Sequence, residues 1–179
     1  MGVNLIAGVW GFAEATLFFI VPDVWLSIAG RDHLHQGLRA CLYGVVGALI
    51  GGSIIYFWGA HDCASAAAVM EKIPAVSTDM VSRVRQELTE HGTWAIMLGI
   101  FSGTPYKLYT AQAASAGIEF WMFLLVSIPA RLIRFGSVTI LCHYVVKLSR
   151  WSGLTANSMT VILLGWTLFY LIFFWMMPN

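Results

Sequence analysis

The chain has 179 residues, of which 59% are hydrophobic and only 11% are charged, against roughly a quarter charged in a typical soluble domain. Its formal net charge is +1, which gives no electrostatic basis for binding nucleic acid. The composition excludes an ordinary soluble protein and predicts a single all-α integral membrane domain over residues 1–179.

The first predicted element covers residues 5–30, which is long enough to cross a bilayer but contains Pro22. Proline lacks a backbone N–H and disfavours helix at the residue before it. On an unbroken helix, Glu14 and Asp23 would lie on opposite faces, because successive residues are ~100° apart. A break at Pro22 lets a re-entrant hairpin turn both carboxylates inward, so we expect a hairpin here.

A helix rich in small residues and a polar segment follow. After a short polar loop (31–39), residues 40–60 carry no charge and predict a transmembrane helix. Its Gly47-x-x-x-Gly51 motif lets a second backbone approach closely, which indicates helix packing. Residues 62–92 have one apolar helical face among charged side chains. This pattern fits a helix in the membrane interface or a solvated connecting helix, and both interpretations stay open.

The second half of the sequence follows the plan of the first. Residues 93–118 contain Pro105 close to Lys107 and predict a second re-entrant hairpin. Residues 120–146 predict a transmembrane helix, and residues 151–177, which carry no charge, predict the final one. Two units of broken hairpin plus helix are typical of inverted-repeat transporters, whose substrate site lies where the broken helices meet at mid-membrane.

Five ionisable side chains interrupt these hydrophobic segments: Glu14, Asp23, Lys107, Arg131 and Arg134. Each costs roughly 2.5–3.5 kcal/mol to insert, so such residues usually face a bundle interior and mark a pathway. Two carboxylates against three cations leave one positive charge without a partner, which a lipid phosphate could neutralise. Arg131 and Arg134 share a helical face and could form one phosphate clamp. The alternative is that the five groups only pair with one another to hold the bundle.

Three motifs carry a resemblance to a known family. They are Glu14 followed by Pro22-Asp23, the glycine-rich Gly51-Gly52-Ser53-Ile54-Ile55-Tyr56-Phe57-Trp58-Gly59, and His91-Gly92 leading through Gly99-Ile100-Phe101 to Pro105-Tyr106-Lys107 and Ala114-Ser115-Ala116-Gly117. With these motifs the chain resembles the DedA superfamily, also called the VTT or SNARE-associated Golgi protein family, and its compact bacterial YqaA-like branch. The chain departs from the family where many members have Gly-Arg-Phe followed by a second arginine. It has Ile100 in place of the first arginine, and Lys107 stands in for the second.

The resemblance implies opposed re-entrant hairpins and movement of lipids between leaflets. The lipids of bacterial members are undecaprenyl phosphate or phospholipids, and their acidic pair is linked to proton dependence. We therefore expect a translocase of an anionic, phosphate-bearing lipid, with Glu14 and Asp23 as proton-exchanging or gating carboxylates. Lys107, Arg131 and Arg134 would bind the headgroup. The alternatives are a proton-coupled transporter of a small solute or ion, and a membrane assembly factor that transports nothing.

An enzyme is not expected. Ser102 and His143 invite comparison with a rhomboid-like Ser–His dyad, but the sequence before Ser102-Gly103 is one residue too long for the Gly-x-Ser-Gly signature. No metal or other cofactor is expected, because the sequence offers no matching second pair of metal-binding residues to complete a site with His33 and His35.

The location and partners follow from the distribution of charge. Four basic residues in short loops (Arg31, Arg39, Lys147 and Arg150) favour the cytoplasm for their side of the membrane. We expect a multi-pass protein of the bacterial inner membrane. The expected partners are membrane lipids, and a homo-oligomer is left open.

Overall fold

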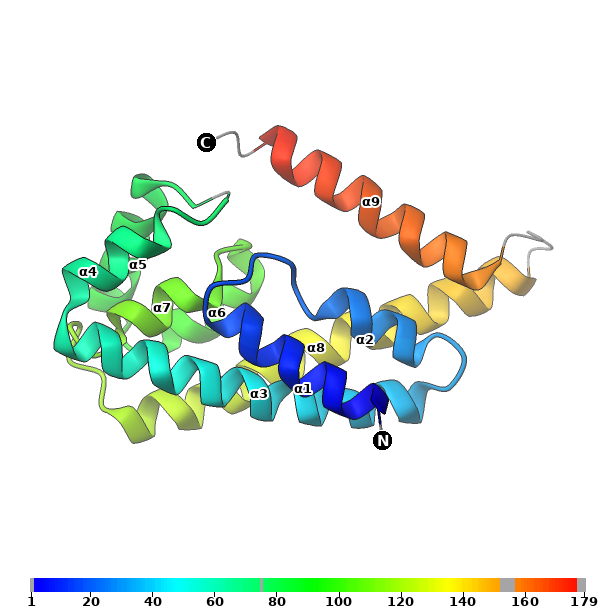
Figure 1. Ribbon diagram of the computed structural model, residues 1–179, viewed down its shortest axis with the longest axis horizontal. Helices are drawn as coiled ribbons and strands as arrows, with labels where there is room; N and C mark the ends of the chain where they lie inside the picture. Colours follow the sequence, from blue (N-terminus) through cyan, green and yellow to red (C-terminus); the bar gives the residue numbers. More distant parts are fainter. Residues whose placement is uncertain (1, 75, 152–156, 177–179) are drawn as a thin grey trace.

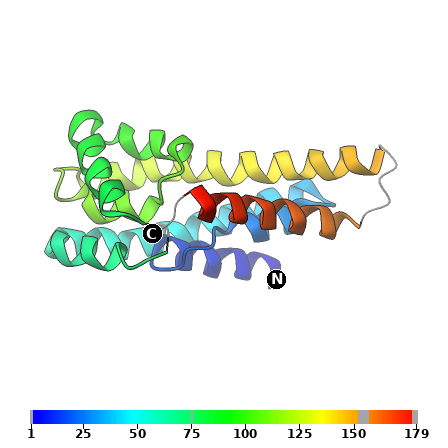
Figure 2. The ribbon, with the colours of Figure 1, turned by 90° about the horizontal axis from the view of Figure 1, so that it is seen from above.

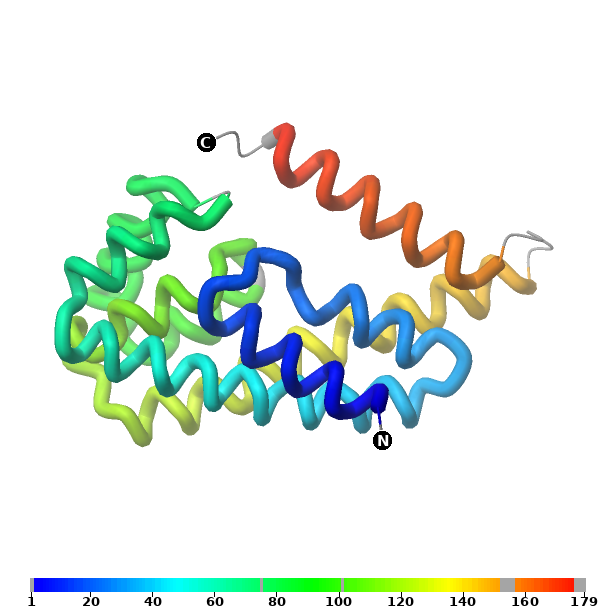
Figure 3. The backbone as a smooth tube through the Cα atoms, in the orientation of Figure 1, coloured from blue at the N-terminus to red at the C-terminus, as the bar shows by residue number. Residues whose placement is uncertain are grey.

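The computed structural model describes residues 2–74, 76–151 and 157–176. Within these ranges every regular element is a helix, which confirms the all-α prediction (Figure 1, Figure 3). Three of the helices, α3, α8 and α9, are long and apolar enough to cross a bilayer. In chain order the helices are α1 (Gly2–Ala15), α2 (Asp23–Gly30), α3 (Leu34–His61), α4 (Cys63–Met70), α5 (Thr78–His91), α6 (Trp94–Ser102), α7 (Tyr106–Ala113), α8 (Phe120–Trp151) and α9 (Ser158–Met176).

The two longest helices, α3 and α8, run antiparallel and form the frame of the molecule (Figure 1, Figure 2). Helix α1 lies along α3, and α2 packs against both long helices. A Cβ atom at Gly47 would lie 1.9 Å from the Gly8 carbonyl oxygen, and one at Gly51 would lie 2.7 Å from the Phe12 carbonyl oxygen. The Gly47–Gly51 motif therefore lies at a close backbone contact between α1 and α3.

Both proline-containing segments are broken beside their prolines. Pro22 directly precedes α2 and Pro105 directly precedes α7, positions where the missing N–H removes no helical hydrogen bond. The first break opens at residue 16, earlier than Pro22 alone predicts, where the Thr16 hydroxyl bonds back to carbonyls of the last turn of α1. At the second break Gly103 adopts the left-handed conformation (φ 74°) that ends α6.

The chain folds back on itself after each break. Helix α2 runs opposite to α1 in both ribbon views (Figure 1, Figure 2). In the second segment, Tyr109 of α7 packs on Gly99 of α6. Helix α2 also contacts α8, and α7 contacts α3. The helix after each break, α2 or α7, therefore contacts the long helix of the other half of the chain. The two halves of the chain are packed together at their breaks.

Two helices extend beyond their predicted bounds. Helix α3 begins at Leu34, so most of the predicted polar loop 31–39 is helical. Helix α8 continues past 146 to Trp151, which therefore does not begin the final helix. Lysine, arginine and glutamine are good helix formers, so their polarity alone does not end a helix. The predicted helix 151–177 appears as α9, with residues 152–156 and 177 outside the described part of the chain.

The predicted polar segment 62–92 forms two helices, α4 and α5, that pack against α7. The Tyr109 hydroxyl donates to the Glu87 carboxylate at 2.6 Å, and the Gln112 amide donates to the Val81 carbonyl at 3.1 Å. These contacts fix the apolar face of α5 on α7 and leave most of its charged side chains exposed.

Helix α9 is attached to the first half of the chain by hydrogen bonds along its length. The Trp166 indole N–H donates to the Ser27 hydroxyl at 2.9 Å, and the Val21 backbone N–H donates to the Tyr170 hydroxyl at 3.0 Å. The large apolar side chains on the rest of α9 are mostly exposed, as lipid-facing side chains would be.

The end of α8 is tied to the α2–α3 connection by an ion cluster. Arg150 and Arg31 both donate to the Asp32 carboxylate, and Arg150 also donates to the Ser158 hydroxyl at the start of α9. The hydrogen bonds from Arg150 and Arg31 hold the pKa of Asp32 below its usual range. This cluster places the start of α3, the end of α8 and the start of α9 at one end of the molecule.

Candidate functional site

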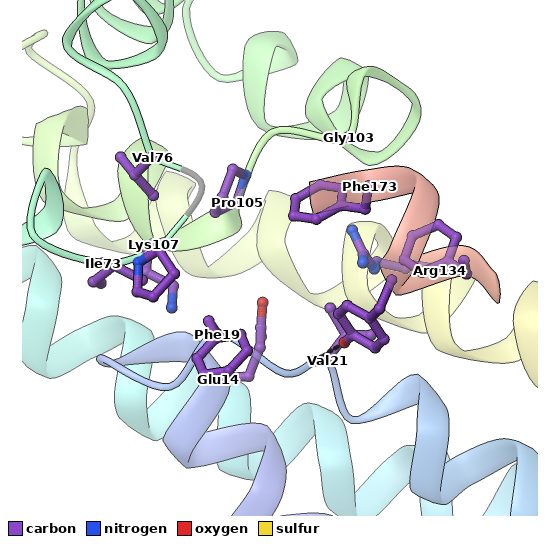
Figure 4. A pocket seen from close by; sticks show the side chains of 13 residues that line it. Glu14, Phe19, Val21, Ile73, Val76, Gly103, Pro105, Lys107, Arg134 and Phe173 are labelled. Atoms are coloured by element: carbon purple, nitrogen blue, oxygen red, sulfur yellow. Dashed lines mark hydrogen bonds between the residues drawn. The ribbon is translucent and has the colours of Figure 1, made fainter. Parts of the chain in front are cut away.

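A cavity of about 230 Å³ lies where the two chain breaks approach each other (Figure 4). The first break contributes Phe19 and Val21, and the second contributes Gly103 and Pro105. Helix α9 and the α4–α5 connection supply the remaining apolar walls. Three charged side chains from three different helices also line the cavity: Glu14, Lys107 and Arg134.

The innermost ion pair joins Glu14 of α1 to Arg131 of α8. The Arg131 Nη2 atom lies 3.4 and 3.5 Å from the two Glu14 carboxylate oxygens, and the two residues are 3% and 4% exposed. The Arg131 guanidinium also stacks on the Tyr106 ring, with Cζ 3.8 Å from the ring centroid. Tyr106 is fixed in turn by its hydroxyl, which donates to the Ser127 hydroxyl at 2.8 Å. Arg131 is therefore held between the two halves of the chain.

The second ion pair joins Asp23, the first residue of α2, to Arg134, one turn along α8. The Arg134 Nε atom lies 3.3 Å from an Asp23 carboxylate oxygen. Asp23 is only 1% exposed, whereas the Arg134 side chain is 23% exposed and lines the cavity. Arg134 therefore presents part of its guanidinium to the cavity while the rest is anchored on α2.

Lys107, the second residue of α7, has a different kind of partner. Its ammonium group donates to the Phe18 backbone carbonyl at 2.6 Å, and the residue is 2% exposed. The acceptor is available because residues 16–22 are not helical, so the Phe18 carbonyl has no helical hydrogen bond to accept. Lys107 thus joins the second break to the first, and its side chain lines the same cavity as that of Glu14 (Figure 4).

Three buried polar atoms of this cluster have no hydrogen-bond partner among the described residues: one carboxylate oxygen each of Glu14 and Asp23, and the Nε atom of Arg131. A buried polar atom without a partner costs about 1–3 kcal/mol, so each such atom calls for an explanation, and a bound ligand or a catalytic role is one. Of the three residues, only Glu14 lines the cavity, so the cluster keeps unused bonding capacity in and directly behind the cavity wall.

The predicted site residues fall into three groups. Glu14, Lys107, Arg134 and Pro105 line the cavity. Arg131 lies behind it against Glu14, and Asp23 lies beneath Arg134. Pro22 directly precedes α2 and does not line the cavity, while Gly47 and Gly51 lie under α1. Arg131 and Arg134 face different carboxylates, so the cavity wall contains one arginine where the sequence suggested a clamp of two.

The aromatic wall supplied by α9 was missed from the sequence. Phe169, Tyr170 and Phe173 line the cavity, and Phe173 lies across it from Lys107, whereas Ile73 and Val76 of the α4–α5 connection lie on the side of Lys107 (Figure 4). Tyr170 and Phe173 lie one and four positions after Phe169, so all three are on one helical face. This pattern was not recognised because most residues of 151–177 are apolar.

Ser102 and His143 have separate partners. The Ser102 hydroxyl donates to Thr104 at 2.9 Å, and the His143 ring nitrogen Nδ1 lies 2.8 Å from the Gly30 carbonyl oxygen. Within the described ranges no group of three or more metal-binding side chains is present.

One curated relative, an uncharacterized protein of Haemophilus influenzae, is 26% identical over 155 residues, which cover 79% of this chain and 69% of the relative. No family model and no solved structure matches the chain. An uncharacterized relative brings no activity to the chain, so the geometry of the cavity is the basis for assigning one.

Proposed function

We propose that this chain is a membrane protein that moves an anionic, phosphate-bearing lipid between the two leaflets, as its resemblance to the DedA superfamily implies. The observation that carries the proposal is the cavity at the meeting point of the two chain breaks, where Lys107 and Arg134 face Glu14. In this proposal both broken segments are opposed re-entrant hairpins of an inverted repeat, and the membrane is the bacterial inner membrane. The interlocked packing of α2 on α8 and α7 on α3 supports that arrangement.

The charge balance of the cluster favours an anionic ligand. Arg131 is matched by Glu14 and Arg134 by Asp23, while the partner of Lys107 is an uncharged carbonyl. The cluster therefore carries one surplus positive charge, and a second if either carboxylate takes up a proton. Because a charge in a low-dielectric site needs a counter-ion, a phosphate between Lys107 and Arg134 would be bound by charge-assisted hydrogen bonds.

The walls of the cavity favour a lipid over a free anion. Around the charged groups the lining is aromatic or aliphatic, with Phe19, Phe169 and Phe173 among its residues. A small inorganic ion gains nothing from such walls, whereas a headgroup that carries hydrocarbon gains burial of apolar surface. Protonation of Glu14 would raise the positive charge of the site, which is how proton coupling would enter the cycle.

One alternative has an observation in its favour. Both carboxylates are ion-paired, and Arg131 is almost fully buried, as expected if the charges only lock the helices of an assembly factor together. The cation Lys107 argues against this alternative, because its partner is an uncharged carbonyl and a network that served packing alone would not need an unmatched charge.

The test is lipid flipping in liposomes that contain the purified protein. Wild-type protein is expected to accelerate flipping of a fluorescent lipid phosphate more than that of a neutral lipid. Lys107→Gln removes the charge and keeps a polar side chain with N–H donors, so we expect flipping of the lipid phosphate to fall by about tenfold or more. Flipping of the neutral lipid should change little.

Lys147→Gln is the matched control, because Lys147 is an exposed cation on α8 that does not line the cavity. It should leave both lipids unaffected. Wild-type protein that flips neither lipid, or a Lys107→Gln variant that slows both equally, would exclude the headgroup assignment.

A further inference from the structure

An apolar groove of about 420 Å³ runs between α8 and α9 and shares Phe169 with the charged cavity. Its lining residues are hydrophobic apart from a glycine: Val138, Leu141, Cys142, Val145, Val146, Val161, Ile162, Gly165, Trp166 and Phe169. The one hydrogen-bonding N–H of the Trp166 side chain is already donated to Ser27. The groove therefore offers contact surface for hydrocarbon and no free polar side-chain donor.

The groove continues the same helix faces that line the cavity. On α8, Val138 and Val145 lie four and eleven positions after Arg134, and these spacings keep them on the face of Arg134. On α9, Phe169 and Gly165 lie four and eight positions before Phe173, again on one face. The groove thus begins one helical turn beyond the cationic wall of the cavity.

From this continuity we infer that the groove between α8 and α9 binds a hydrocarbon chain of the same lipid whose phosphate lies against Lys107 and Arg134. The inference rests on the proposed function and adds a second subsite to it. Between residues 138 and 146 the groove follows α8 for about 12 Å at 1.5 Å per residue, which suits an extended chain segment. The chain length of the lipid, as well as its charge, should therefore determine affinity.

Gly165 allows the groove to be filled without disturbing its walls. A Cβ atom built on Gly165 meets no other atom within 4 Å, so a larger side chain there would occupy the groove itself. Gly136 on α8 is the matched control, because it also has open space around its Cβ position but does not line the groove. Gly165→Trp and Gly136→Trp therefore make the same change inside and outside the proposed subsite.

The experiment measures binding of chain-matched probes to the full-length purified protein by native mass spectrometry. The probes are hexadecyl phosphate, butyl phosphate and the nonionic hexadecyl ether of hexaethylene glycol. We expect wild-type protein to prefer hexadecyl phosphate over butyl phosphate by roughly tenfold or more, because each buried methylene adds affinity. We expect a similar preference over the nonionic ether, because the ether has no charge for Lys107 and Arg134 to bind. Gly165→Trp should remove most of the preference over butyl phosphate, while Gly136→Trp should keep it.

The outcomes separate this inference from the function on which it rests. Equal binding of the two phosphates by wild type, or equal losses in both tryptophan variants, would overturn the groove and leave the headgroup site standing. If the nonionic ether binds as well as hexadecyl phosphate, the groove holds ordinary bilayer lipid and the inference is wrong. Binding of neither phosphate would remove the headgroup site and the groove together.

Photolabelling of the wild-type protein locates the bound chain without any variant. Hexadecyl phosphate with a diazirine at mid-chain, bound to wild-type protein, should attach within residues 138–146 of α8 or 161–169 of α9. Lys107→Gln should reduce this labelling, because the phosphate anchors the chain. Labelling spread evenly over the exposed apolar face of α3, which includes Leu42, Val46 and Ile50, would contradict the proposal.

Discussion

Arg131 connects more of this molecule than any other side chain of the charged cluster. It contacts the Glu14 carboxylate of α1 and stacks on Tyr106 of α7, while belonging to α8. Replacing a buried ion pair by apolar residues is often neutral or stabilising, yet removing only one partner costs about 3–5 kcal/mol. An apolar pair would stabilise the fold as well as Glu14 and Arg131 do, so stability does not explain why the ion pair is present. Removing one partner alone would still destabilise the fold.

A double-mutant cycle on this pair separates stability from transport. We expect Glu14→Gln to lower stability by about 3–5 kcal/mol, because it leaves the Arg131 charge buried without a counter-ion. Glu14→Gln combined with Arg131→Met removes both charges and should recover most of that loss. Thermal unfolding of the purified variants in detergent measures this part.

Lipid flipping by the double variant decides the role of the pair. If Glu14 exchanges protons or gates the cavity, flipping stays lost although the protein is stable again. Recovery of flipping together with stability would mean that the pair only locks α1 to α8.

From the sequence we expected the five charged residues of the hydrophobic segments to face the interior of the bundle, but not how they would pair. They are Glu14, Asp23, Lys107, Arg131 and Arg134. Their inward orientation follows from the high cost of exposing any of them to lipid. The partners depend on offsets that the sequence does not specify: residues three apart on a helix differ by about 60° in direction, enough to aim Arg131 and Arg134 at different carboxylates. The bond from Lys107 to the Phe18 carbonyl depends on where α1 ends, which Pro22 alone does not determine.

At the scale of elements, the contact between α1 and α3 depends on glycines. The Cβ position of Gly47 lies 1.9 Å from the Gly8 carbonyl oxygen. This is far below van der Waals contact, and backbone atoms cannot move aside without shifting the whole of α1. Because Glu14 is on the last turn of α1, a shift of that helix would also displace the base of the cavity.

Gly47→Ala is therefore expected to destabilise the protein by about 1–3 kcal/mol, since overpacking forces a backbone shift. Gly165→Ala is the control, because the same substitution there meets open space and should be neutral or stabilising by about 0.5–1 kcal/mol. The melting temperatures of the two variants provide the comparison. Equal melting temperatures would mean that α1 is free to move on α3.

Element boundaries were predictable where chemistry ends a helix and not where composition merely changes. Pro22 and Pro105 directly precede helices, where their missing N–H groups break no helical hydrogen bond. By contrast, polarity at 31–39 suggested a loop that is mostly helix, and the charge-free run from Trp151 suggested one helix where α8 ends and α9 begins later. The contact of α2 with both long helices depends on tertiary packing, which hydropathy does not encode.

At the scale of the whole molecule, the ends of the long helices define two sides. The ion cluster of Asp32 with Arg31 and Arg150 joins the start of α3 to the end of α8. If both broken segments re-enter, α3 and α8 cross the membrane in opposite directions, and their joined ends face the compartment that holds the basic loops. The α4–α5 segment, which follows the other end of α3, would face the opposite compartment.

Accessibility labelling of single cysteines tests this topology. In a background without the three native cysteines, labels at Gln36 and Ser152 should react from one side, and labels at Ser77 and Asn179 from the other. Ser152 and Asn179 lie outside the described residues, so these two positions test a prediction made from the sequence alone. An odd number of crossings between Gln36 and Ser152 would put them on opposite sides. That result would require one broken segment to span the bilayer, and the cavity would then lack the opposed hairpins on which the transport proposal depends.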